Sequence, residues 1–473
     1  MNRARNASTA THSVRFAITV VAAIAASSCV APPDPAEDPG PPPVPRARIL
    51  VNERPHDPAS VEVELPEVRY GDPLHVLLDG LPPGELVVLD SSGGAGTSRA
   101  RFLVPEDGVV ELARDAPESG DWQGADAEAF ITQMRDPPGG ALDLDLSVVV
   151  SRDADEDGEP DEELARASVH RRYIDEGLVV EEVHSGRTVG ALALPPGEGP
   201  FPAVLVFGGS EGGTGTGVFH AMYLASLGYA ALGVGYFDAA GLPSGLTDVP
   251  LEILEEDLAF LTADPRIDPE RVVVMGGSRG GELALLVGVH FPVVAGVIAE
   301  VPSGLVWGSG SDATGAAWTL DGAPLPYVPA SDVEPEVEVD DAGAAHWRMR
   351  GMFLADMERA AAEALAAATI PAEEISGPVL FLSGDDDQLW PSCVLAEVAV
   401  ARRRRSDDVV LCHPEAGHAS VGVPGWSTVD SVESFHPALD GYLVLGGTAQ
   451  GNGRALRAND TAVRAFLEAV LAD

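Results

Sequence analysis

The chain has 473 residues, of which 45% are hydrophobic. This length exceeds what one hydrophobic core normally organises, so we expect two domains plus tails. Its 74 acidic residues against 29 basic residues give a formal net charge of -45, spread along the chain. Nucleic acid is excluded as an expected partner because no basic stripe is present to bind phosphates, and the acidity favours solubility in a salty or extracellular setting.

The first 29 residues have the pattern of a secretory signal peptide. Arg3, Arg5 and Arg15 lead into an apolar run at residues 16–26, which is too short to cross a bilayer as a permanent helix. The sequence Ala-Ser-Ser-Cys then resembles a bacterial lipobox, although Ala stands where Leu is usual. We expect export to the cell envelope, with Cys29 lipidated and anchored in a membrane by its acyl chains. Ordinary cleavage nearby, with Cys29 incidental, is the alternative.

The next two segments differ in composition. Residues 30–46 are so rich in Pro that we expect an extended, semi-rigid linker there. Residues 47–176 contain short alternating apolar runs, such as VEVEL, ELVVLD and LDLSVVV, separated by Pro, Gly, Asp and Ser. Period-two runs at this spacing predict an all-β, immunoglobulin-like antiparallel sandwich.

One acidic stretch inside this domain resembles a calcium loop. DADEDGEPD at residues 153–161 has the oxygen ligands and the Gly at the sixth place. The twelfth place is Leu164, where a bidentate Glu would complete the cage. We therefore interpret the stretch as an acidic, solvated hairpin turn and assign no metal to the protein.

After Gly177 the pattern changes to buried-strand runs that alternate with helical stretches. The strand runs include PAVLVF, YAALGV, RVVVMG, VVAGVIAE, PVLFLSG and DVVLC, and helices are expected at residues 218–227, 251–262, 279–289, 395–404 and 456–471. Such alternation predicts a mostly parallel sheet with helices on both faces, here over residues 177–473. Residues 303–375 interrupt the alternation, and we expect this insertion to form a lid or pocket wall.

The sharpest local motif is VVVMGGSRGGELALLVG, in which a β-rich run ends at a Gly-rich turn and a helical run begins at once. Gly276, Ser278 and Gly280 form the G-x-S-x-G nucleophile elbow of an α/β-hydrolase in its required strand-turn-helix setting. The small residues are needed because the nucleophile sits at a strained backbone position and neighbouring elements crowd the turn. We therefore predict Ser278 as a nucleophile.

A serine hydroxyl is a weak nucleophile, so it needs a base that a carboxylate holds in one tautomer. In this fold the acid and then the base follow the serine along the chain. For the acid we select Asp387, in the acidic loop after PVLFLSG, over Asp386. For the base we select His418, on a loop after DVVLC, over His413, which lies nearer the strand.

An acyl-transfer site also needs donors for the oxyanion. We expect one from the backbone N–H of Arg279, which follows the nucleophile, and one from Ser210 or its neighbour in the glycine run after PAVLVF. That run lacks the Gly-Lys-Ser/Thr of a phosphate loop, so nucleotide binding is not expected there. The resulting mechanism is a two-step acyl transfer through an acyl-enzyme, which requires no metal or organic cofactor.

Cys393 and Cys412 are too few for a disulfide framework. They can pair in an oxidising compartment or remain buried free thiols, and the sequence does not decide between these states.

Ordered segments across residues 50–470 resemble the acyl-CoA thioesterase and bile acid-CoA:amino acid N-acyltransferase family. They include DGLPPGELVVL, SRARFLVPEDGVVEL, LARASVHRRYIDEGL, LALPPGEGPFPAVLVFGGSEGG, YAALGVGYFDAAGLP, GGSRGGELAL, ISGPVLFLSGDDDQLWPS and EAGHAS. The resemblance implies a β-sandwich followed by an α/β-hydrolase, with a triad that maps onto Ser278, Asp387 and His418. Transferase members of the family use Cys as nucleophile, so the serine favours hydrolysis.

The leading hypothesis is therefore a lipoprotein hydrolase whose substrate is a small acyl thioester or carboxylic ester. Export and strong acidity depart from the intracellular family members that act on acyl-CoA, because CoA phosphates call for Arg or Lys. Residues 402–405 form a basic run that a solvated helix face explains at least as well. The alternatives are a peptidase or acyltransferase with the same triad, or a non-catalytic binding lipoprotein on a hydrolase scaffold.

Overall fold

The computed structural model describes residues 47–51, 62–64, 67–94, 96–135, 143–309, 315–420 and 428–472. The predicted signal peptide, Cys29 and the Pro-rich linker lie outside the described residues. Residues Pro45–Asp473 form one compact unit. Among the helices of the described ranges, none combines the length and the apolar character needed to span a bilayer.

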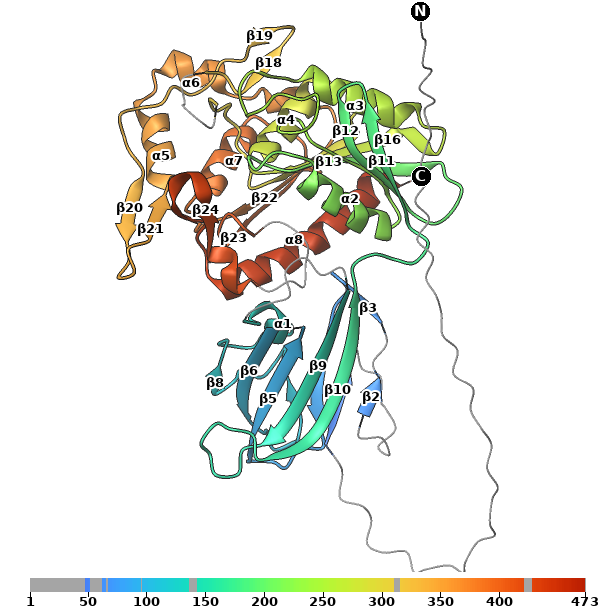
Figure 1. Cartoon of the computed structure of the whole chain (residues 1–473), viewed down its shortest axis with the longest axis vertical. Helices are drawn as coiled ribbons and strands as arrows, with labels where there is room; N and C mark the ends of the chain where they lie inside the picture. The colour runs from blue at the N-terminus through green and yellow to red at the C-terminus, as the bar shows by residue number, and fades with distance from the viewer. Residues whose placement is uncertain are drawn as a thin grey trace, which may run out of the picture. The chain divides into compact units, whose positions relative to one another are not determined.

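Two β-sheets share one hydrophobic core in the N-terminal part (Figure 1). The smaller sheet contains β1 (Arg48–Val51), β4 (Val76–Asp79) and β7 (Val110–Glu111). The larger sheet contains, in order, β2 (Glu62–Glu64), β10 (Glu162–Arg172), β9 (Asp143–Arg152), β5 (Leu86–Gly93), β6 (Gly96–Leu103) and β8 (Ser119–Gly120), with β3 (Val68–Arg69) also beside β10. A short helix, α1 (Ala129–Thr132), is buried against this core.

This arrangement confirms the predicted sandwich. Alternate residues of β9 are buried, among them Leu146, Val148 and Val150, because successive side chains of a strand point to opposite faces. One feature differs from the antiparallel expectation, since β2 and β3 pair parallel to β10. Each is far from β10 along the chain, so no hairpin fixes its direction.

The second part contains an eight-stranded sheet. Its order is β11 (Val179–Ser185), β12 (Thr188–Leu194), β14 (Ala230–Val234), β13 (Phe201–Phe207), β16 (Ile267–Gly277), β17 (Gly296–Glu300), β22 (Val379–Gly384) and β23 (Val409–His413). The β11–β12 and β12–β14 pairs are antiparallel and the other neighbours are parallel. The mostly parallel sheet predicted from the apolar runs is therefore confirmed.

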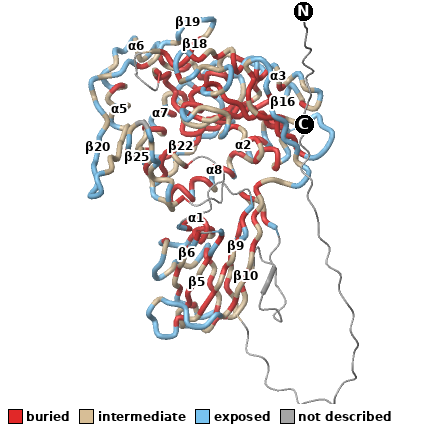
Figure 2. Tube along the Cα trace, in the orientation of Figure 1, coloured by how far each residue is buried: buried red, intermediate tan, exposed pale blue. Residues whose placement is uncertain are grey.

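Helices cover both faces of this sheet, which explains why its central strands are apolar along their whole length. On one face lie α3 (Glu252–Ala263), α4 (Arg279–His290) and α7 (Ser392–Val400). On the other face lie α2 (Gly215–Ser226) and α8 (Ala449–Val470). Figure 2 shows the buried residues running through the central strands between these layers.

Two helix boundaries differ from the prediction by more than three residues. Helix α7 ends at Val400 and not at residue 404, because Arg403 turns inward and donates to the carbonyl oxygens of Ala372 and Ile375, at 2.8 Å each. Helix α8 begins at Ala449 and not at residue 456, after Thr448 caps its first turn.

The insertion contributes several small elements. Strand β18 (Trp318–Leu320) pairs with β15 (Val249–Pro250) and β19 (Ala323–Pro324). Strands β20 (Glu336–Val339) and β21 (Ala345–Arg348) form a sheet with β25 (Gly441–Val444) and β24 (Glu433–His436). Helices α5 (Arg350–Arg359) and α6 (Ala362–Ala368) follow, and the short 3-10 turns are η1 (Ala372–Glu374), η2 (Val429–Val432) and η3 (Pro437–Leu439). The insertion is thus joined to the C-terminal strands.

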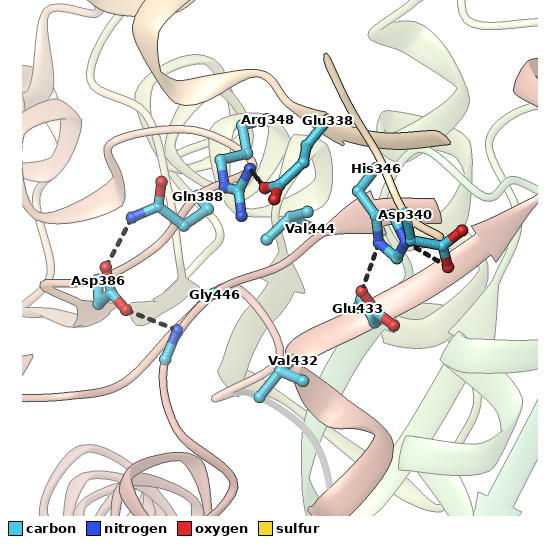
Figure 3. A pocket seen from close by; sticks show the side chains of 11 residues that line it. Glu338, Asp340, His346, Arg348, Asp386, Gln388, Val432, Glu433, Val444 and Gly446 are labelled. Atoms are coloured by element: carbon cyan, nitrogen blue, oxygen red, sulfur yellow. Dashed lines mark hydrogen bonds and ion pairs between the residues drawn. The ribbon is translucent and has the colours of Figure 1, made fainter. Parts of the chain in front are cut away.

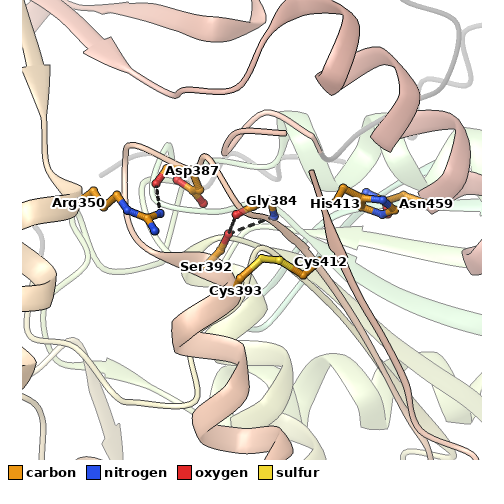
Figure 4. The surroundings of a disulfide bond; sticks show 8 residues. All are labelled: Arg350, Gly384, Asp387, Ser392, Cys393, Cys412, His413 and Asn459. Carbon is orange, nitrogen blue, oxygen red and sulfur yellow. Dashed lines mark hydrogen bonds between the residues drawn. A yellow bond between two sulfur atoms is a disulfide. The ribbon is translucent and has the colours of Figure 1, made fainter. Parts of the chain in front are cut away.

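Cys393 and Cys412 form a disulfide, which resolves the alternative left open by the sequence (Figure 4). Cys393 lies in the first turn of α7 and Cys412 lies in β23, with their Cα atoms 5.7 Å apart. The bond therefore joins the segment that follows Asp387 to the segment that precedes His418.

Replacing both cysteines by serine should lower the free energy of unfolding by about 3 kcal/mol, because the unfolded chain regains the freedom of the loop that the disulfide closes. The loop spans a sequence separation of 19. Urea unfolding followed by tryptophan fluorescence measures the change, with reduced wild-type protein as the matched control. Equal unfolding midpoints for the oxidised protein and the double variant would contradict a stabilising role.

Candidate active site

Ser278 lies at the sharp turn between β16 and α4, with φ 59° and ψ -121°. Two glycines make this turn possible. A Cβ on Gly276 would lie 2.4 Å from the carbonyl oxygen of Gly280, and a Cβ on Gly280 would lie 2.1 Å from that of Gly208. The backbone of the turn therefore has the strain and the crowding that the motif predicted.

The side chains of the three predicted residues meet in one hydrogen-bonded row. The Nε2 atom of His418 lies 2.9 Å from Ser278 Oγ, and its Nδ1 atom lies 2.8 Å from Asp387 Oδ2. Asp387 is fully buried and His418 is 8% exposed. The imidazole can accept the serine proton at Nε2 when its Nδ1–H donates to the carboxylate.

The carboxylate of Asp387 is oriented by its own loop. Its Oδ1 atom accepts hydrogen bonds from the backbone N–H groups of Leu389 and Trp390, at 3.1 Å each, which leaves Oδ2 for the imidazole. Arg350, from α5, donates to the carbonyl oxygen of Asp387 at 2.7 Å (Figure 4). The insertion therefore helps to hold the loop that carries the acid.

The carboxylate of Asp386, the alternative acid, has other hydrogen-bond partners than that of Asp387. Its carboxylate accepts from Gln388 Nε2 at 2.6 Å and from the Gly447 N–H at 3.1 Å. It faces a charged cavity of ≈ 520 Å³ (Figure 3), which is also lined by Glu338, Asp340, His346, Arg348 and Glu433. Of the two neighbouring carboxylates, only Asp387 contacts His418 within the described part of the chain.

His413, the alternative base, is held by α8. Its Nε2 atom lies 2.6 Å from Oδ1 of Asn459. A second asparagine on the same helix, Asn452, accepts the N–H of Gly417 at 2.7 Å, and the N–H of His418 donates to the Leu445 carbonyl at 2.8 Å. The loop between these anchors is thereby fixed, and it presents His418 to Ser278.

The loop that carries Ser210, one of the expected oxyanion donors, lies against the turn at Ser278. A Cβ on Gly209 would lie 3.1 Å from Ser278 Cβ, so the loop after β13 packs directly on the elbow. Neither the Ser210 N–H nor the Arg279 N–H has a hydrogen-bond acceptor among the described residues. These two N–H groups are therefore candidate oxyanion donors.

The side chain of Arg279 joins the elbow to the insertion. Its guanidinium pairs with Glu282 at 3.0 Å and donates to the carbonyl oxygen of Trp307 at 3.0 Å. Glu282, which is fully buried, accepts from Trp318 Nε1 at 2.6 Å. Burial raises the pKa of Glu282 to about 7, and the charge of Arg279 opposes this rise.

Aromatic side chains flank His418. The ring of Trp390 meets the imidazole edge to face with centroids 5.9 Å apart. Phe353 of α5 contacts both Trp390 and Trp307, at 5.9 Å and 4.7 Å. Two of these three rings come from the insertion, which therefore contributes to an aromatic cluster that reaches His418 through Trp390.

The sequence reasoning missed this cluster and the α8 asparagines. The sequence offers a signal for Trp390, because this residue follows Asp387 by three positions and so belongs to the same loop. Asn452, Asn459 and Phe353 carried none, since their spacing from the motifs says nothing about which strand end they reach.

One group of acidic side chains has metal-ligand spacing within the described residues. One carboxylate oxygen from each of Asp153, Asp155 and Asp161 lies within 4.8 Å of the others, in the turn between β9 and β10. Asp153 pairs with Arg101 at 2.6 Å and Asp161 accepts the Ala154 N–H. The stretch is a hairpin turn, as the sequence predicted.

The basic run at residues 402–405 follows α7 and is occupied by contacts within the protein. Arg402 pairs with Glu373, Arg403 with Asp408 and Arg405 with Asp407, while Arg404 donates to backbone carbonyl oxygens. This run is therefore a set of local ion pairs and not a helix face.

Two family models match the chain. The model described as acyl-CoA thioester hydrolase/BAAT N-terminal region covers residues 71–185. The model described as BAAT/acyl-CoA thioester hydrolase C terminal covers residues 249–473. The first covers most of the sandwich and ends in β11, and the second begins at β15 and covers the later strands of the eight-stranded sheet.

Curated relatives align over most of the chain. Mouse acyl-coenzyme A amino acid N-acyltransferase 1 is 27% identical over 419 residues, which cover 81% of this chain and 91% of that protein. Human acyl-coenzyme A thioesterase 6 is 28% identical over 407 residues, which cover 82% and 90%. Among solved structures, an α/β hydrolase from Penicillium sp. sh18 covers 63% of this chain and 99% of its own, with 14% identity and a TM-score of 0.37. The two family models together show that this chain belongs to the acyl-CoA thioester hydrolase/BAAT family.

Proposed function

We propose that this protein is a serine hydrolase that cleaves acyl thioesters or carboxylic esters through an acyl-enzyme. The observation that carries the proposal is the hydrogen-bonded row of Ser278, His418 and Asp387, with distances of 2.9 Å and 2.8 Å. Family membership supports acyl-transfer chemistry in general, because the relatives are named as acyl-CoA thioesterases and N-acyltransferases.

In the first step, Ser278 Oγ attacks the acyl carbonyl carbon while His418 Nε2 takes the hydroxyl proton. Asp387 accepts the Nδ1–H bond and stabilises the imidazolium that forms. The carbonyl oxygen becomes an oxyanion, which the backbone N–H groups of Arg279 and Ser210 bind. The tetrahedral intermediate then expels the thiol or alcohol, which receives its proton from His418.

In the second step, His418 removes a proton from water as the water attacks the acyl-enzyme. The second tetrahedral intermediate returns Ser278 and releases the carboxylic acid. Hydrolysis is favoured over transfer to an amino acid because the nucleophile is a serine, whereas transferase members of the family use cysteine. The apolar ring of Trp390 beside His418 favours an apolar acyl group close to the base.

The chain's charge bears on the leaving group. A formal net charge of -45 repels the phosphates of CoA. An arginine that already forms an ion pair would have to leave its carboxylate in order to bind a phosphate. We therefore propose a neutral acyl thioester or ester as the preferred substrate class.

Ser278→Ala should lower kcat/KM at least about 10⁴-fold for every hydrolysed substrate, because the nucleophile is lost. The panel consists of one acyl group on CoA, on N-acetylcysteamine, on p-nitrophenol and on p-nitroaniline. We expect turnover of the thioester of N-acetylcysteamine and of the p-nitrophenyl ester, little turnover of the anilide, and a CoA rate that rises with salt as repulsion is screened.

A fluorophosphonate probe supplies the control that needs no substrate. It should label the wild-type protein and not Ser278→Ala. Fastest turnover of the anilide would favour the peptidase alternative. Absence of labelling in the folded wild-type protein would favour the non-catalytic scaffold.

Asp387→Asn should lower kcat about 10⁴-fold, since the amide holds the imidazole in the wrong tautomer. Asp386→Asn is the matched control, because it changes the neighbouring carboxylate without altering a contact to His418. We expect near wild-type kcat for this variant. A larger loss in Asp386→Asn than in Asp387→Asn, measured by initial rates with the p-nitrophenyl ester, would reverse the assignment.

We also propose that the protein is exported and anchored through a lipid on Cys29. The N-terminal pattern motivates this proposal, and the Cys393–Cys412 disulfide supports it, because stable disulfides belong to oxidising compartments.

Expression in a bacterial host with an alkyne-labelled fatty acid tests the anchor. The wild-type chain should incorporate the label and sediment with membranes, and Cys29→Ala should do neither. Label that persists in Cys29→Ala, or a wild-type protein that stays cytoplasmic, would overturn this proposal without affecting the catalytic one.

A further inference from the structure

Tyr236 lies just beyond the end of β14, next to the loop that contains Gly209, and has no part in the hydrolytic mechanism proposed above. The side chain is 2% exposed. Its ring meets Phe207 edge to face with centroids 5.9 Å apart and lies against Trp318 at 5.6 Å. Contacts on these sides leave the ring a single position, so the hydroxyl is also fixed in space.

The Tyr236 hydroxyl donates to the carbonyl oxygen of Gly209 at 2.5 Å and lies 3.3 Å from that of Gly208. Burial raises the pKa of Tyr236 well above its ordinary value. The hydroxyl therefore keeps its proton at neutral pH and acts as a donor.

This bond sets the direction of the next peptide group. A peptide bond is planar and trans, so the Gly209 carbonyl and the Ser210 N–H point in opposite directions. A carbonyl that is held on the buried Tyr236 turns the Ser210 N–H away from the protein interior. That N–H has no acceptor among the described residues.

The other side of Gly209 is held as well. Its N–H donates to both carboxylate oxygens of Glu211, at 3.0 Å each. The residue also packs on the elbow, because a Cβ at this position would come 3.1 Å from Ser278 Cβ and from the Gly277 carbonyl oxygen. The Gly209–Ser210 peptide is therefore fixed on both sides and lies beside the nucleophile.

We propose that Tyr236 is a positioning residue for acyl transfer, which orients the Gly209–Ser210 peptide so that the Ser210 N–H receives the oxyanion. The inference rests on the proposed function, because it assigns a second part to the same site. Tyr236 touches neither the substrate nor the reacting atoms. It acts through the peptide, and the preorganised donor needs no rearrangement when charge develops on the carbonyl oxygen.

Tyr236→Phe removes the hydroxyl and keeps the ring. We expect kcat for the p-nitrophenyl ester to fall about 10- to 100-fold, less than the 10²- to 10³-fold that accompanies removal of an oxyanion donor itself. KM should stay within about twofold, since the lost interaction belongs to the transition state. Tyr236→p-aminophenylalanine, which restores a donor on the same ring, should recover most of the rate.

A matched control separates positioning from stability. The Tyr173 hydroxyl, also buried, donates to the backbone carbonyl oxygen of Phe219 at 2.8 Å. Tyr173→Phe therefore deletes the same kind of bond in the same chemical way. We expect it to lower Tm by a similar amount and to leave kcat unchanged.

A transition-state analogue provides a second readout. An acyl trifluoromethyl ketone forms a bond from its carbonyl carbon to Ser278 Oγ, the serine proton passes to His418, and the ketone oxygen becomes the oxyanion. Its inhibition constant should rise in Tyr236→Phe by the factor by which kcat/KM falls.

An unchanged kcat in folded Tyr236→Phe, or an inhibition constant that does not move with kcat/KM, would overturn the assignment. So would equal losses of kcat in Tyr236→Phe and Tyr173→Phe. Failure of the proposed function gives a different result, because the wild-type protein would then lack Ser278-dependent turnover altogether.

Discussion

The structure depends on a close contact between three backbones at the nucleophile elbow. Ser278 adopts φ 59°, and the turn that holds it brings Gly276, Gly280 and Gly208 so close that a Cβ on Gly276 or Gly280 would collide with a carbonyl oxygen. Because β13, β16 and α4 meet at this point, the serine, its helix and the oxyanion loop are fixed together. A strained residue persists only where the surrounding structure determines it in this way.

The acid and the base reach the serine from other strand ends, and distant segments hold them there. Asn452 and Asn459 of α8 tether the loop that carries His418. Arg350, from the insertion, binds the loop that carries Asp387. The Cys393–Cys412 disulfide joins the chain after the acid to the chain before the base. The hydrogen-bonded row of Ser278, His418 and Asp387 is thus held by polar contacts and one covalent bond behind it, the arrangement that a preorganised site requires.

The surroundings of the site are charged near Asp386 and aromatic near His418. The cavity beside Asp386 is lined by carboxylates, of which Glu338 pairs with Arg348 and Glu433 contacts His346. Beside His418, by contrast, lies the aromatic ring of Trp390, which Phe353 contacts in turn. The two neighbouring acidic residues therefore have different surroundings: Asp386 faces the charged cavity, and Asp387 contacts the imidazole of His418.

The sequence by itself determined the two-part architecture, the order of the apolar strands along the chain, the turn that carries Ser278 and the two loops that supply the acid and the imidazole, because these follow from local periodicity and from a motif with a fixed chain order. Helix α8 was predicted to begin at residue 456, whereas it begins at Ala449. The difference arises because Gly451 and Gly453 disfavour a helix locally. A Cβ on Gly451 would lie 2.0 Å from the Glu415 carbonyl oxygen, so close packing requires the glycine. Only the tertiary structure decided between Asp386 and Asp387, paired the cysteines and brought Tyr236 to the Gly209 carbonyl. These are contacts between residues far apart in the chain, and local patterns carry no information about which distant groups will meet.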